Sequence, residues 1–557
     1  MSEKESNIPM GTKVAYGAPS FAGAAMGIPI AIHLTIFYSD TILVPLGVIA
    51  LVKALARALD AITDPVMGWA SDSTRTRWGR RRPWIALGAP LAAVMFYLMF
   101  TPPVELDAVT AATWFMVTYT LYYVFHTLYI IPHISLGLEL TSDYNERSTL
   151  FGIREAFVIA GTLVAAVMPP VLISIMGDTR DGYSTFAIIF GSLLVILYLN
   201  LVFRVSERPD YMTREANPLI PGVRRVMRNS VFRLLLFVYL VGSLTGAIPG
   251  LMMPYFTKYV LQPENPQLWL AIFLGSYFLG GFLALPVWVW LARRYEKKPV
   301  WLAGFVPGIV GLSAMYFLEP GDLILTAVIL GFAGTGFSAG LFLSPAMKAD
   351  VIDYDEFHTG KRREAQFSAL WTVMTKFMVI PSMSLPLAIL ASVGYAPNVE
   401  QTDTVKTTIK AIFCLGPAIT AMIAFGIGWF YPLTKIKHRE ILDGIESHKS
   451  GLGVNDPITG HYVLPPNQRG IDEKVGWELD HYSLAELEML NSNGKSSLSR
   501  QILMLLVFVV IGFVCFTFTV YHLVRFRHCY TLMVPESSVI QQHIDVTRQM
   551  KNGMGTV

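Results

Sequence analysis

Long runs of apolar residues, separated by short polar connections, fill the first 431 residues of the chain. Each run is about 20 residues or longer, the length that a helix needs to cross the hydrocarbon core of a bilayer. The pattern predicts twelve core helices, roughly at 14–38, 42–70, 83–101, 109–138, 149–176, 184–204, 232–257, 267–292, 299–318, 321–348, 364–394 and 406–431. We therefore expect an all-α polytopic membrane protein.

A polar connection at 205–231 divides these helices six and six. The N-terminal half is expected to cover 1–204 and the C-terminal half 232–431. Each half carries a basic loop after its second helix, at 75–82 and 293–298, which is a weak sign of an internal repeat. Two helical halves of this kind are typical of transport folds in which a binding site lies between the halves near the bilayer midplane.

The chain changes character beyond residue 431. Residues 432–498 are polar and predict a cytoplasmic tail, in which Ser483–Glu486 fits a capping box that opens a short helix. The apolar run 501–524 is long enough for a thirteenth membrane helix, expected within 499–525, and 526–557 would form a C-terminal tail.

Composition supports the membrane class and excludes others. Only 15% of the residues are charged, whereas a soluble chain carries roughly 25%. A net charge of +3 indicates no nucleic-acid partner. The cysteines Cys414, Cys515 and Cys529 are too few and too scattered for a disulfide framework or a zinc site. No cleavable signal peptide is visible, so the first apolar segment is expected to stay in place.

Lysine and arginine collect in alternate loops, and this pattern predicts the orientation. The basic connections follow the second, sixth, eighth and tenth helices, whereas the intervening loops are short and mostly acidic. The basic residues include Arg75, Arg77, Arg80, Arg81 and Arg82, then Arg204 to Arg233, Arg293, Arg294, Lys297 and Lys298, and Lys361, Arg362 and Arg363. We expect a multi-pass protein of the cell inner (plasma) membrane with a cytoplasmic N-terminus.

Four ionisable residues mark the second predicted helix. Lys53, Arg57, Asp60 and Asp64 follow a 4-3-4 spacing and so share one helix face. Each would cost at least ~2.5–3.5 kcal/mol at the centre of an isolated membrane helix. A structural Arg–Asp pair is one interpretation. The other is a coupling-ion site, because a cation or a proton relieves the repulsion between two carboxylates one turn apart.

Four motifs together resemble one family. They are Ala56–Trp69 (ARALDAITDPVMGW), Ser71–Pro83 (SDSTRTRWGRRRP), Ala349–Tyr354 (ADVIDY) and Tyr431–Ile441 (YPLTKIKHREI). At this spacing the chain resembles the glycoside-pentoside-hexuronide:cation symporters of the major facilitator superfamily, over residues 14–441. The resemblance implies a major facilitator fold and alternating-access uptake of a small organic solute, in the first instance a sugar or glycoside, coupled to Na⁺ or H⁺.

The resemblance also implies roles for single residues. Cation binding would fall to Asp60, Asp64, Thr63 and Thr127, with Na⁺ possible at the two aspartates, and Lys376 in the eleventh helix would pair with an acid of the second. Further candidates at substrate or coupling positions are Arg57, Tyr123, His126 and Arg154. The aromatic run 119–129 is also compatible with plain helix packing, and Arg154 with an ion pair to Glu155. No cofactor other than the coupling ion is expected.

Three departures from the family pattern and one set of charges leave alternatives open. In melibiose permease, acidic and tryptophan side chains bind the sugar, and the aligned positions here are Ala24, Ile130 and Ile134. Arg80 and Arg82, with Asp350 and Asp353 at the start of the loop after the tenth helix, are candidates for a cytoplasmic gate. A solvated loop explains the two aspartates equally well, and the positive-inside rule explains the arginines.

Rival functions fit less well. The chain carries no H-E-x-x-H or G-x-S-x-G enzyme motif, and Asn493–Ser496 lacks the first glycine of a P-loop. A symporter of an amphipathic or lipid-like solute is the alternative cargo class, and a non-transporting sensor on the same fold is a further alternative. The expected partners are a small-molecule solute and the lipid bilayer, and we expect a monomer.

Overall fold

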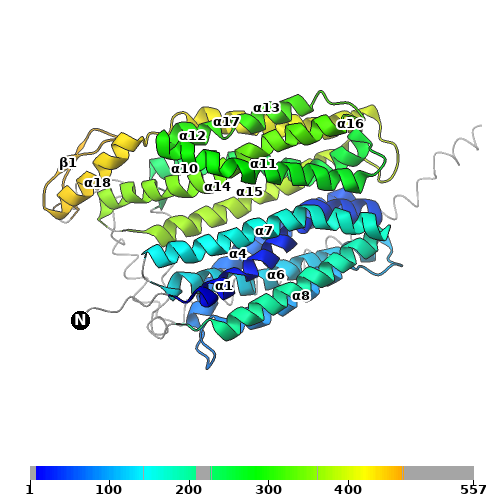
Figure 1. The fold of residues 1–557 in the computed structure, drawn as a ribbon, viewed down its shortest axis with the longest axis horizontal. Coiled ribbons are helices and arrows are strands. Elements are labelled where there is room, and N and C mark those ends of the chain that lie inside the picture. Colours follow the sequence, from blue (N-terminus) through cyan, green and yellow to red (C-terminus); the bar gives the residue numbers. More distant parts are fainter. Residues whose placement is uncertain are drawn as a thin grey trace, which may run out of the picture.

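The computed structural model describes residues 8–141, 144–207, 226–227, 229–360, 362–466 and 468 of the 557-residue chain. The predicted thirteenth helix within 499–525, its tail 526–557, the capping box at Ser483–Glu486 and most of the linker 205–231 lie outside this part. The described chain is almost entirely helical, and its helices form two bundles side by side (Figure 1).

The N-terminal bundle begins with a continuous helical segment that changes its winding. This segment comprises α1 (Met10–Gly17), α2 (Pro19–Ile28), the π turn η1 (Pro29–His33), α3 (Leu34–Ile36) and a second π turn, η2 (Phe37–Thr41). The bundle continues with α4 (Leu46–Ser73), α5 (Arg82–Phe100), α6 (Ala108–Leu140), α7 (Tyr144–Met176) and α8 (Thr179–Arg204). Asp107 and Asp178 accept backbone N–H bonds and so cap the N-termini of α6 and α8.

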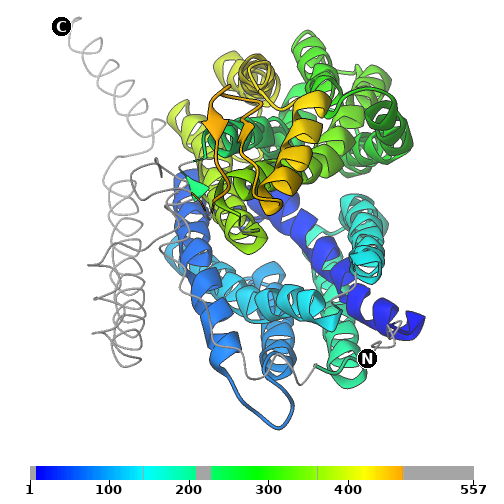
Figure 2. The ribbon, with the colours of Figure 1, turned by 90° about the vertical axis from the view of Figure 1, so that its left-hand side faces the viewer.

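The C-terminal bundle repeats this plan. Its elements are α10 (Ser230–Tyr255), η4 (Phe256–Leu261), α11 (Pro266–Arg294), α12 (Lys297–Ala303), α13 (Val306–Met315), α14 (Leu323–Thr359), α15 (Glu364–Ser392), α16 (Asp403–Lys410), η5 (Ala411–Leu415) and α17 (Gly416–Gly428). Within the described residues it is followed by α18 (Lys435–Lys449) and a small antiparallel pair, β1 (Val454–Asn455) and β2 (Tyr462–Val463). Figure 2 shows α18 and this pair covering one end of the C-terminal bundle.

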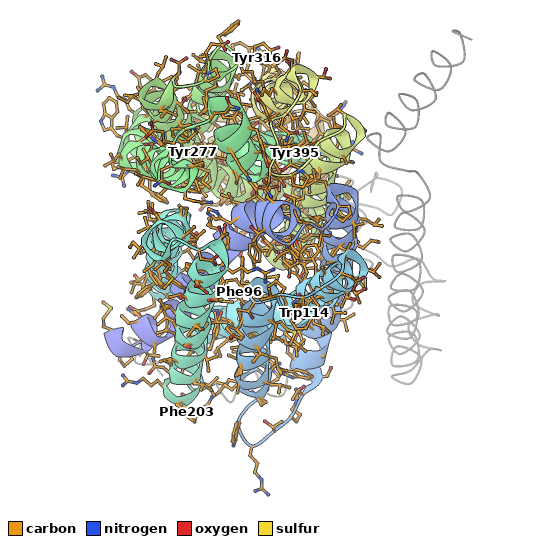
Figure 3. The ribbon with its side chains drawn as sticks, turned by 90° about the vertical axis from the view of Figure 1, so that its right-hand side faces the viewer. Phe96, Trp114, Phe203, Tyr277, Tyr316 and Tyr395 are labelled. Carbon is orange, nitrogen blue, oxygen red and sulfur yellow. The ribbon has the colours of Figure 1, made fainter. Side chains whose placement is uncertain are left out.

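Each bundle has two ends, which we name by their side chains. The arginine end carries the connections 74–81 and 295–296, and the Asp40 end carries the connections 42–45, 101–107 and 262–265. Figure 3 views the molecule from the Asp40 end, where Tyr395 lies near the meeting of the two bundles.

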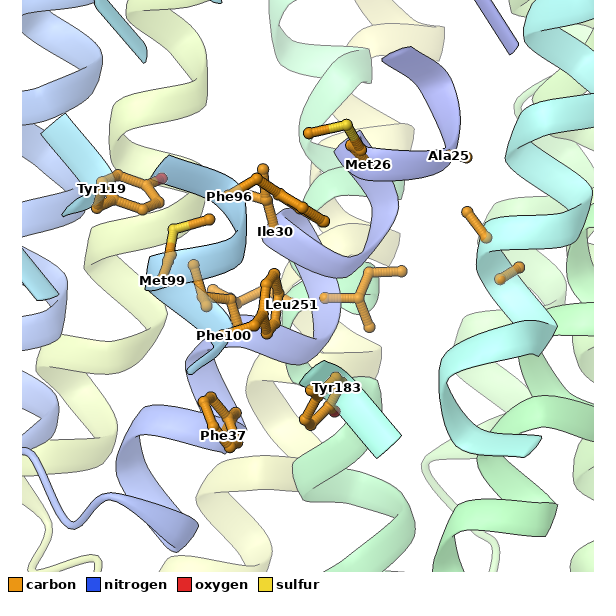
Figure 4. Packing of buried hydrophobic residues seen from close by; sticks show 14 of the residues in the cluster. Ala25, Met26, Ile30, Phe37, Phe96, Met99, Phe100, Tyr119, Tyr183 and Leu251 are labelled. Carbon is orange, nitrogen blue, oxygen red and sulfur yellow. The ribbon is translucent and has the colours of Figure 1, made fainter. Parts of the chain in front are cut away.

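Two clusters of buried apolar residues lie among the helices, a larger one with members from both bundles and a smaller one within the C-terminal half. Aromatic side chains from several helices meet inside the N-terminal bundle, including Phe37, Phe96, Phe100 and Tyr183 (Figure 4). The ring centroids of Phe37 and Tyr183 are 4.9 Å apart and those of Phe100 and Tyr183 are 5.3 Å apart. Large apolar residues such as Leu283 and Ile196 are more than half exposed on the outside of the bundles, as expected for helices that face lipid.

Helices overlap each of the twelve predicted segments, but the structure supports the count of membrane helices only in part, and one boundary needs correction. Eleven helices among the described residues are long and apolar enough to cross a membrane. The twelfth segment, α4, is not among these eleven; it carries four ionisable residues, Lys53, Arg57, Asp60 and Asp64, in its middle. The tenth was expected to end near 348, but α14 continues to Thr359. Asp350 and Asp353 therefore lie on a helix, and their placement in a loop was wrong.

Candidate functional site

The helix α4 carries its ionisable residues into the contact between the two bundles. It packs against α6 of its own half and against α15 of the other half. Asp60 and Asp64 are 2% and 7% exposed, and Lys53 is fully buried. Because the 4-3-4 spacing places these residues on one face, the packing of that face against α15 brings the charges to the boundary between the halves.

Two threonines contact the aspartate pair, Asp60 and Asp64. Thr127 of α6 lies with its Oγ1 3.0 Å from Asp60 Oδ1 and 3.1 Å from Asp64 Oδ1. Thr63 Oγ1 lies 3.4 Å from Thr127 Oγ1 and donates to the Asp60 carbonyl oxygen at 3.2 Å. Since a hydroxyl has one proton to donate, Thr127 satisfies only one carboxylate at a time. The four residues predicted to bind a cation thus form one cluster of oxygen atoms.

Lys376 of α15 completes this cluster from the other half. Its Nζ lies 2.9 Å from Asp60 Oδ2 and 2.5 Å from Asp64 Oδ2. The ammonium therefore occupies the position between the two carboxylates where their repulsion is strongest. An acidic partner for Lys376 from the second predicted helix was expected, and the structure supplies two.

Arg57 adds a second positive charge. Its guanidinium lies 3.3 Å from Asp60 Oδ2 and 4.1 Å from the centroid of the Tyr123 ring. The two positive charges of Arg57 and Lys376 therefore equal in number the two negative charges of Asp60 and Asp64. A buried ion pair is weak evidence for stability, because the desolvation of the charges offsets most of their attraction. A cluster of this kind inside a membrane is more readily explained by a role in binding or transport.

Lys53 is the one residue of the charged face of α4 for which the sequence suggested no separate role. Its Nζ donates to Thr35 Oγ1 of α3 at 2.6 Å. Among the ion pairs of the described residues, none includes Lys53. It therefore joins the second predicted helix to the first through a hydroxyl rather than a carboxylate.

The aromatic run on α6 is largely packed inside the N-terminal bundle. Tyr119, Tyr122 and Tyr129 are at most 2% exposed and Tyr123 is 5% exposed. The ring of His126 lies 5.1 Å from that of Tyr129. The packing interpretation thus describes most of this run, whereas Tyr123 also faces the guanidinium of Arg57.

The structure places Arg154 apart from the aspartate pair. Its guanidinium pairs with Glu155 at 3.1 Å and lies 5.4 Å from the centroid of the Phe151 ring. Both of these contacts are made to neighbours on α7, which agrees with the ion-pair alternative.

The loop 74–81 is held by a carboxylate at the start of the connection between the halves. Glu207 accepts the backbone N–H groups of Arg80, Arg81 and Arg82 at 2.8, 2.8 and 3.0 Å, and so caps the start of α5. Gly79 permits this approach, because it has a φ of 112° and a Cβ there would collide with the Glu207 carboxylate.

The arginine side chains of this loop have partners of their own. Arg80 pairs with Glu139 at 2.6 Å, and the guanidinium of Arg82 donates to the carbonyl oxygen of Val202 at 2.6 Å. These contacts lie within the N-terminal half.

Asp350 and Asp353 form a second charged cluster at the arginine end. Lys297 lies 2.7 Å from Asp350, and Arg362 lies 2.7 Å from Asp353. His438 Nε2 of α18 lies 2.9 Å from Asp353. The three side chains Asp350, Asp353 and His438 are close enough to share a metal ion. Both carboxylates already contact a cationic side chain, so the cluster is well described as an ion-pair network.

Residues 15–435 match a family model described as MFS/sugar transport protein. The chain belongs to this family. It is therefore a membrane transport protein of the major facilitator superfamily and not an enzyme, and the resemblance that the four motifs indicated is confirmed.

Relatives extend over most of the chain. The isoprimeverose transporter of Lactiplantibacillus pentosus is 25% identical over 454 residues, which cover 79% of this chain and 92% of the relative. The sodium-dependent lysophosphatidylcholine symporter 1 of Mus musculus is 25% identical over 502 residues, covering 82% and 92%.

A solved structure supports the fold. A bacterial homologue of the human lysosomal transporter Spinster, in an inward-facing and unoccupied conformation, superposes with a TM-score of 0.56 at 12% identity and covers 78% of this chain and 97% of its own. At this identity the likeness concerns the fold alone. It confirms the predicted all-α major facilitator architecture.

Proposed function

We propose that this member of the family is a cation-coupled symporter of a sugar or glycoside, with its ion site at Asp60 and Asp64. The observation that carries the proposal is the position of Lys376 Nζ, 2.9 and 2.5 Å from the two carboxylates and supplied by the opposite half. An ammonium held there is exchangeable for another cation. Such an exchange would alter the contact between α4 and α15, which is the boundary that alternating access must rearrange.

The chemistry of the cluster suits a hard cation. Carboxylate and hydroxyl oxygens from Asp60, Asp64, Thr63 and Thr127 are ligands that hard cations such as Na⁺ prefer. A proton on one aspartate would serve the same purpose, because it removes the repulsion between the carboxylates. In either case the incoming charge releases Lys376 from the aspartate pair.

The cargo and orientation follow from different arguments. The family model is described as a sugar transport protein, and one relative is named for the transport of isoprimeverose; both favour a sugar-type solute here. The basic loops at the arginine end favour a cytoplasmic position for that end and for the N-terminus in the inner membrane. Under this orientation, Arg80, Arg82, Asp350 and Asp353 lie on the cytoplasmic side, where we propose that they contribute to gating.

Thermal unfolding of the purified protein tests the ion site without a known substrate. An ion that binds only the folded form stabilises it by RT ln(1 + [L]/Kd), which is about 2.7 kcal/mol at a hundredfold excess over Kd. NaCl would be titrated against choline chloride at two pH values, for wild type and for the variant Asp60→Asn/Asp64→Asn. The expected result is a rise in melting temperature with Na⁺, or with H⁺, that the double variant lacks.

A matched control is Asp107→Asn, which alters an exposed carboxylate while keeping an N-cap residue. It should respond to the ions as the wild type does. Equal responses in wild type and double variant would rule out the aspartate pair as the ion site. Uptake of a glycoside panel and a lysolipid panel, driven by the ion so identified, would then decide between the two cargo classes.

A further inference from the structure

A second network of side chains joins the two halves, at the Asp40 end. Asp40 lies on η2, and its Oδ2 accepts hydrogen bonds from Lys258 Nζ at 2.5 Å and from the Tyr259 hydroxyl. Its Oδ1 accepts from the Tyr395 hydroxyl at 2.5 Å and from Ser39 Oγ at 2.7 Å. Both carboxylate oxygens are therefore supplied with donors, and three of these donors belong to the C-terminal half.

Two further bonds cross the same boundary. In the first, Asn398 Nδ2 donates to the Asp40 carbonyl oxygen at 2.6 Å. Within the C-terminal half, Asn398 Oδ1 also accepts from Lys258 Nζ at 2.7 Å. The hydroxyls of Ser39 and Tyr255 are 2.9 Å apart. Asn398 holds a left-handed φ of 59°, which asparagine tolerates better than most residues. The boundary is therefore closed by the backbone as well as by side chains.

Asp40 and Lys258 lie in corresponding elements of the two halves. The first membrane helix of each half ends in a π turn, η2 at Phe37–Thr41 and η4 at Phe256–Leu261. A π turn inserts an extra residue into the helix and so redirects the side chains that follow. Here the two turns carry Asp40 and Lys258, and the carboxylate and the ammonium meet between them.

We propose that Ser39, Asp40, Tyr255, Lys258, Tyr259, Tyr395 and Asn398 form an inter-half lock. The halves separate at the Asp40 end only when this lock opens. Asp40 is its centre, because its carboxylate accepts hydrogen bonds from four different side chains. Charge-assisted bonds of this number to a carboxylate that is only 5% exposed hold the end closed. The inference concerns the opening of one end and does not depend on the identity of the cargo.

Cysteine accessibility in intact cells tests the lock. Ile32 is 4% exposed and lies against Gly250 of the other half, where a Cβ would lie 3.8 Å from Ile32 Cγ1. The substitution Ile32→Cys would be made after Cys414, Cys515 and Cys529 are replaced by serine. A membrane-impermeant maleimide is then added outside. With Asp40→Asn or Lys258→Gln, labelling should become about tenfold faster, since each variant removes a charge-assisted bond.

Two controls keep the experiment decisive. Val104→Cys, at an 80% exposed position of the same end, should label at one rate in every background and so reports sidedness and expression. Asp107→Asn should leave the labelling of Ile32→Cys unchanged. Unchanged labelling in both Asp40→Asn and Lys258→Gln would overturn the lock.

A cross-linking measurement covers the case in which these variants fold poorly. A short bifunctional thiol reagent would join Ser39→Cys to Tyr255→Cys across the boundary. The cross-link should stop the halves from separating at this end. The labelling rate of Ile32→Cys should then no longer increase when the sample is warmed. If the cross-linked protein still exposes Ile32→Cys as fast as the uncross-linked one, the halves separate elsewhere and the inference is wrong.

Discussion

Two carboxylate–lysine contacts hold the halves together, and they differ in how completely they are satisfied. At the Asp40 end, one carboxylate accepts bonds from Ser39, Lys258, Tyr259 and Tyr395. In the middle of the boundary, two carboxylates share the ammonium of Lys376 and the hydroxyl of Thr127, and the guanidinium of Arg57 contacts Asp60 alone. The first network thus supplies four donor side chains to one carboxylate, whereas the second supplies three to two carboxylates, and two of those three donors are shared.

This difference indicates different roles. A carboxylate whose oxygens are all supplied with donors fixes one arrangement. Two carboxylates that share one cation between them can take another cation in its place. Two carboxylates with one ammonium between them are therefore suited to exchange Lys376 for a metal cation or a proton. A carboxylate surrounded by donors offers no such place, and it suits a contact that is only made or broken.

The variant Lys376→Met should have the largest effect on this contrast. Removing the ammonium leaves the aspartate pair without its competitor, so the Na⁺ midpoint of thermal stabilisation should fall about tenfold or more. Net uptake should fall about a hundredfold, because an empty site would have to return with two poorly compensated buried carboxylates. Exchange of labelled solute, in which the site stays occupied, should persist.

The control for this variant is Lys410→Met. The Lys410 side chain is 18% exposed, close to the 19% of Lys376, but it pairs with an exposed acid, Glu319. It should leave both the ion midpoint and uptake near wild type. An unchanged Na⁺ midpoint in Lys376→Met would show that the ammonium and the ion do not compete, and the contrast between the two contacts would lose its basis.

The second prediction concerns Thr127, where the effect should be smaller. Thr127→Val keeps the shape of the side chain but removes the hydroxyl that contacts both carboxylates. The affinity for the coupling cation should fall about tenfold, the size of one lost oxygen ligand or hydrogen bond to a charged group. Thr127→Ser should restore most of it. Ion-dependent melting measures both, and equal losses in the two variants would assign Thr127 to packing alone.

Much of this arrangement follows from local sequence. The lengths of the apolar runs predict the helices, and the 4-3-4 spacing on α4 by itself predicts a charged face. The resemblance to the family adds Thr127 and Lys376, which lie on other helices and are distant in sequence. Their contacts with Asp60 and Asp64 depend on how α6 and α15 pack, and no spacing within one helix contains that information.

The lock at the Asp40 end illustrates what the sequence does not reveal. Asp40 and Lys258 are 218 residues apart, and each is a single charge at the end of an apolar run, where solvated charges are common. Their meeting requires a π turn in both halves, and a π turn depends on tertiary packing more than on local preference. The same holds for α14, which continues past 348 because α18 packs against its end.

A second saturated carboxylate, outside the membrane helices, gives the smallest expected effect and tests the same distinction. Asp456 accepts from the Tyr354 hydroxyl at 2.9 Å, the Ile458 N–H at 2.8 Å and the Thr459 hydroxyl at 2.7 Å, and it lies 3.3 Å from His358. Burial alone would raise its pKa, but the bonds from His358, Thr459 and the backbone hold the pKa of Asp456 well below its usual range. Because its donors already saturate it, Asp456 should stabilise the fold and leave transport unaffected.

The sign of the pH dependence follows from that lowered pKa. A carboxylate with a depressed folded-state pKa contributes stability that is complete above its unfolded pKa, about 3.9, and is lost as the pH falls below it. The variant Asp456→Asn should therefore melt about 2 °C below wild type near about pH 7, and this difference should shrink as the pH is lowered towards about 3. Uptake by the variant should match wild type. A loss of uptake with unchanged stability would mean that a saturated carboxylate takes part in transport. The number of donors around a carboxylate would then no longer distinguish a structural contact from one that functions in transport.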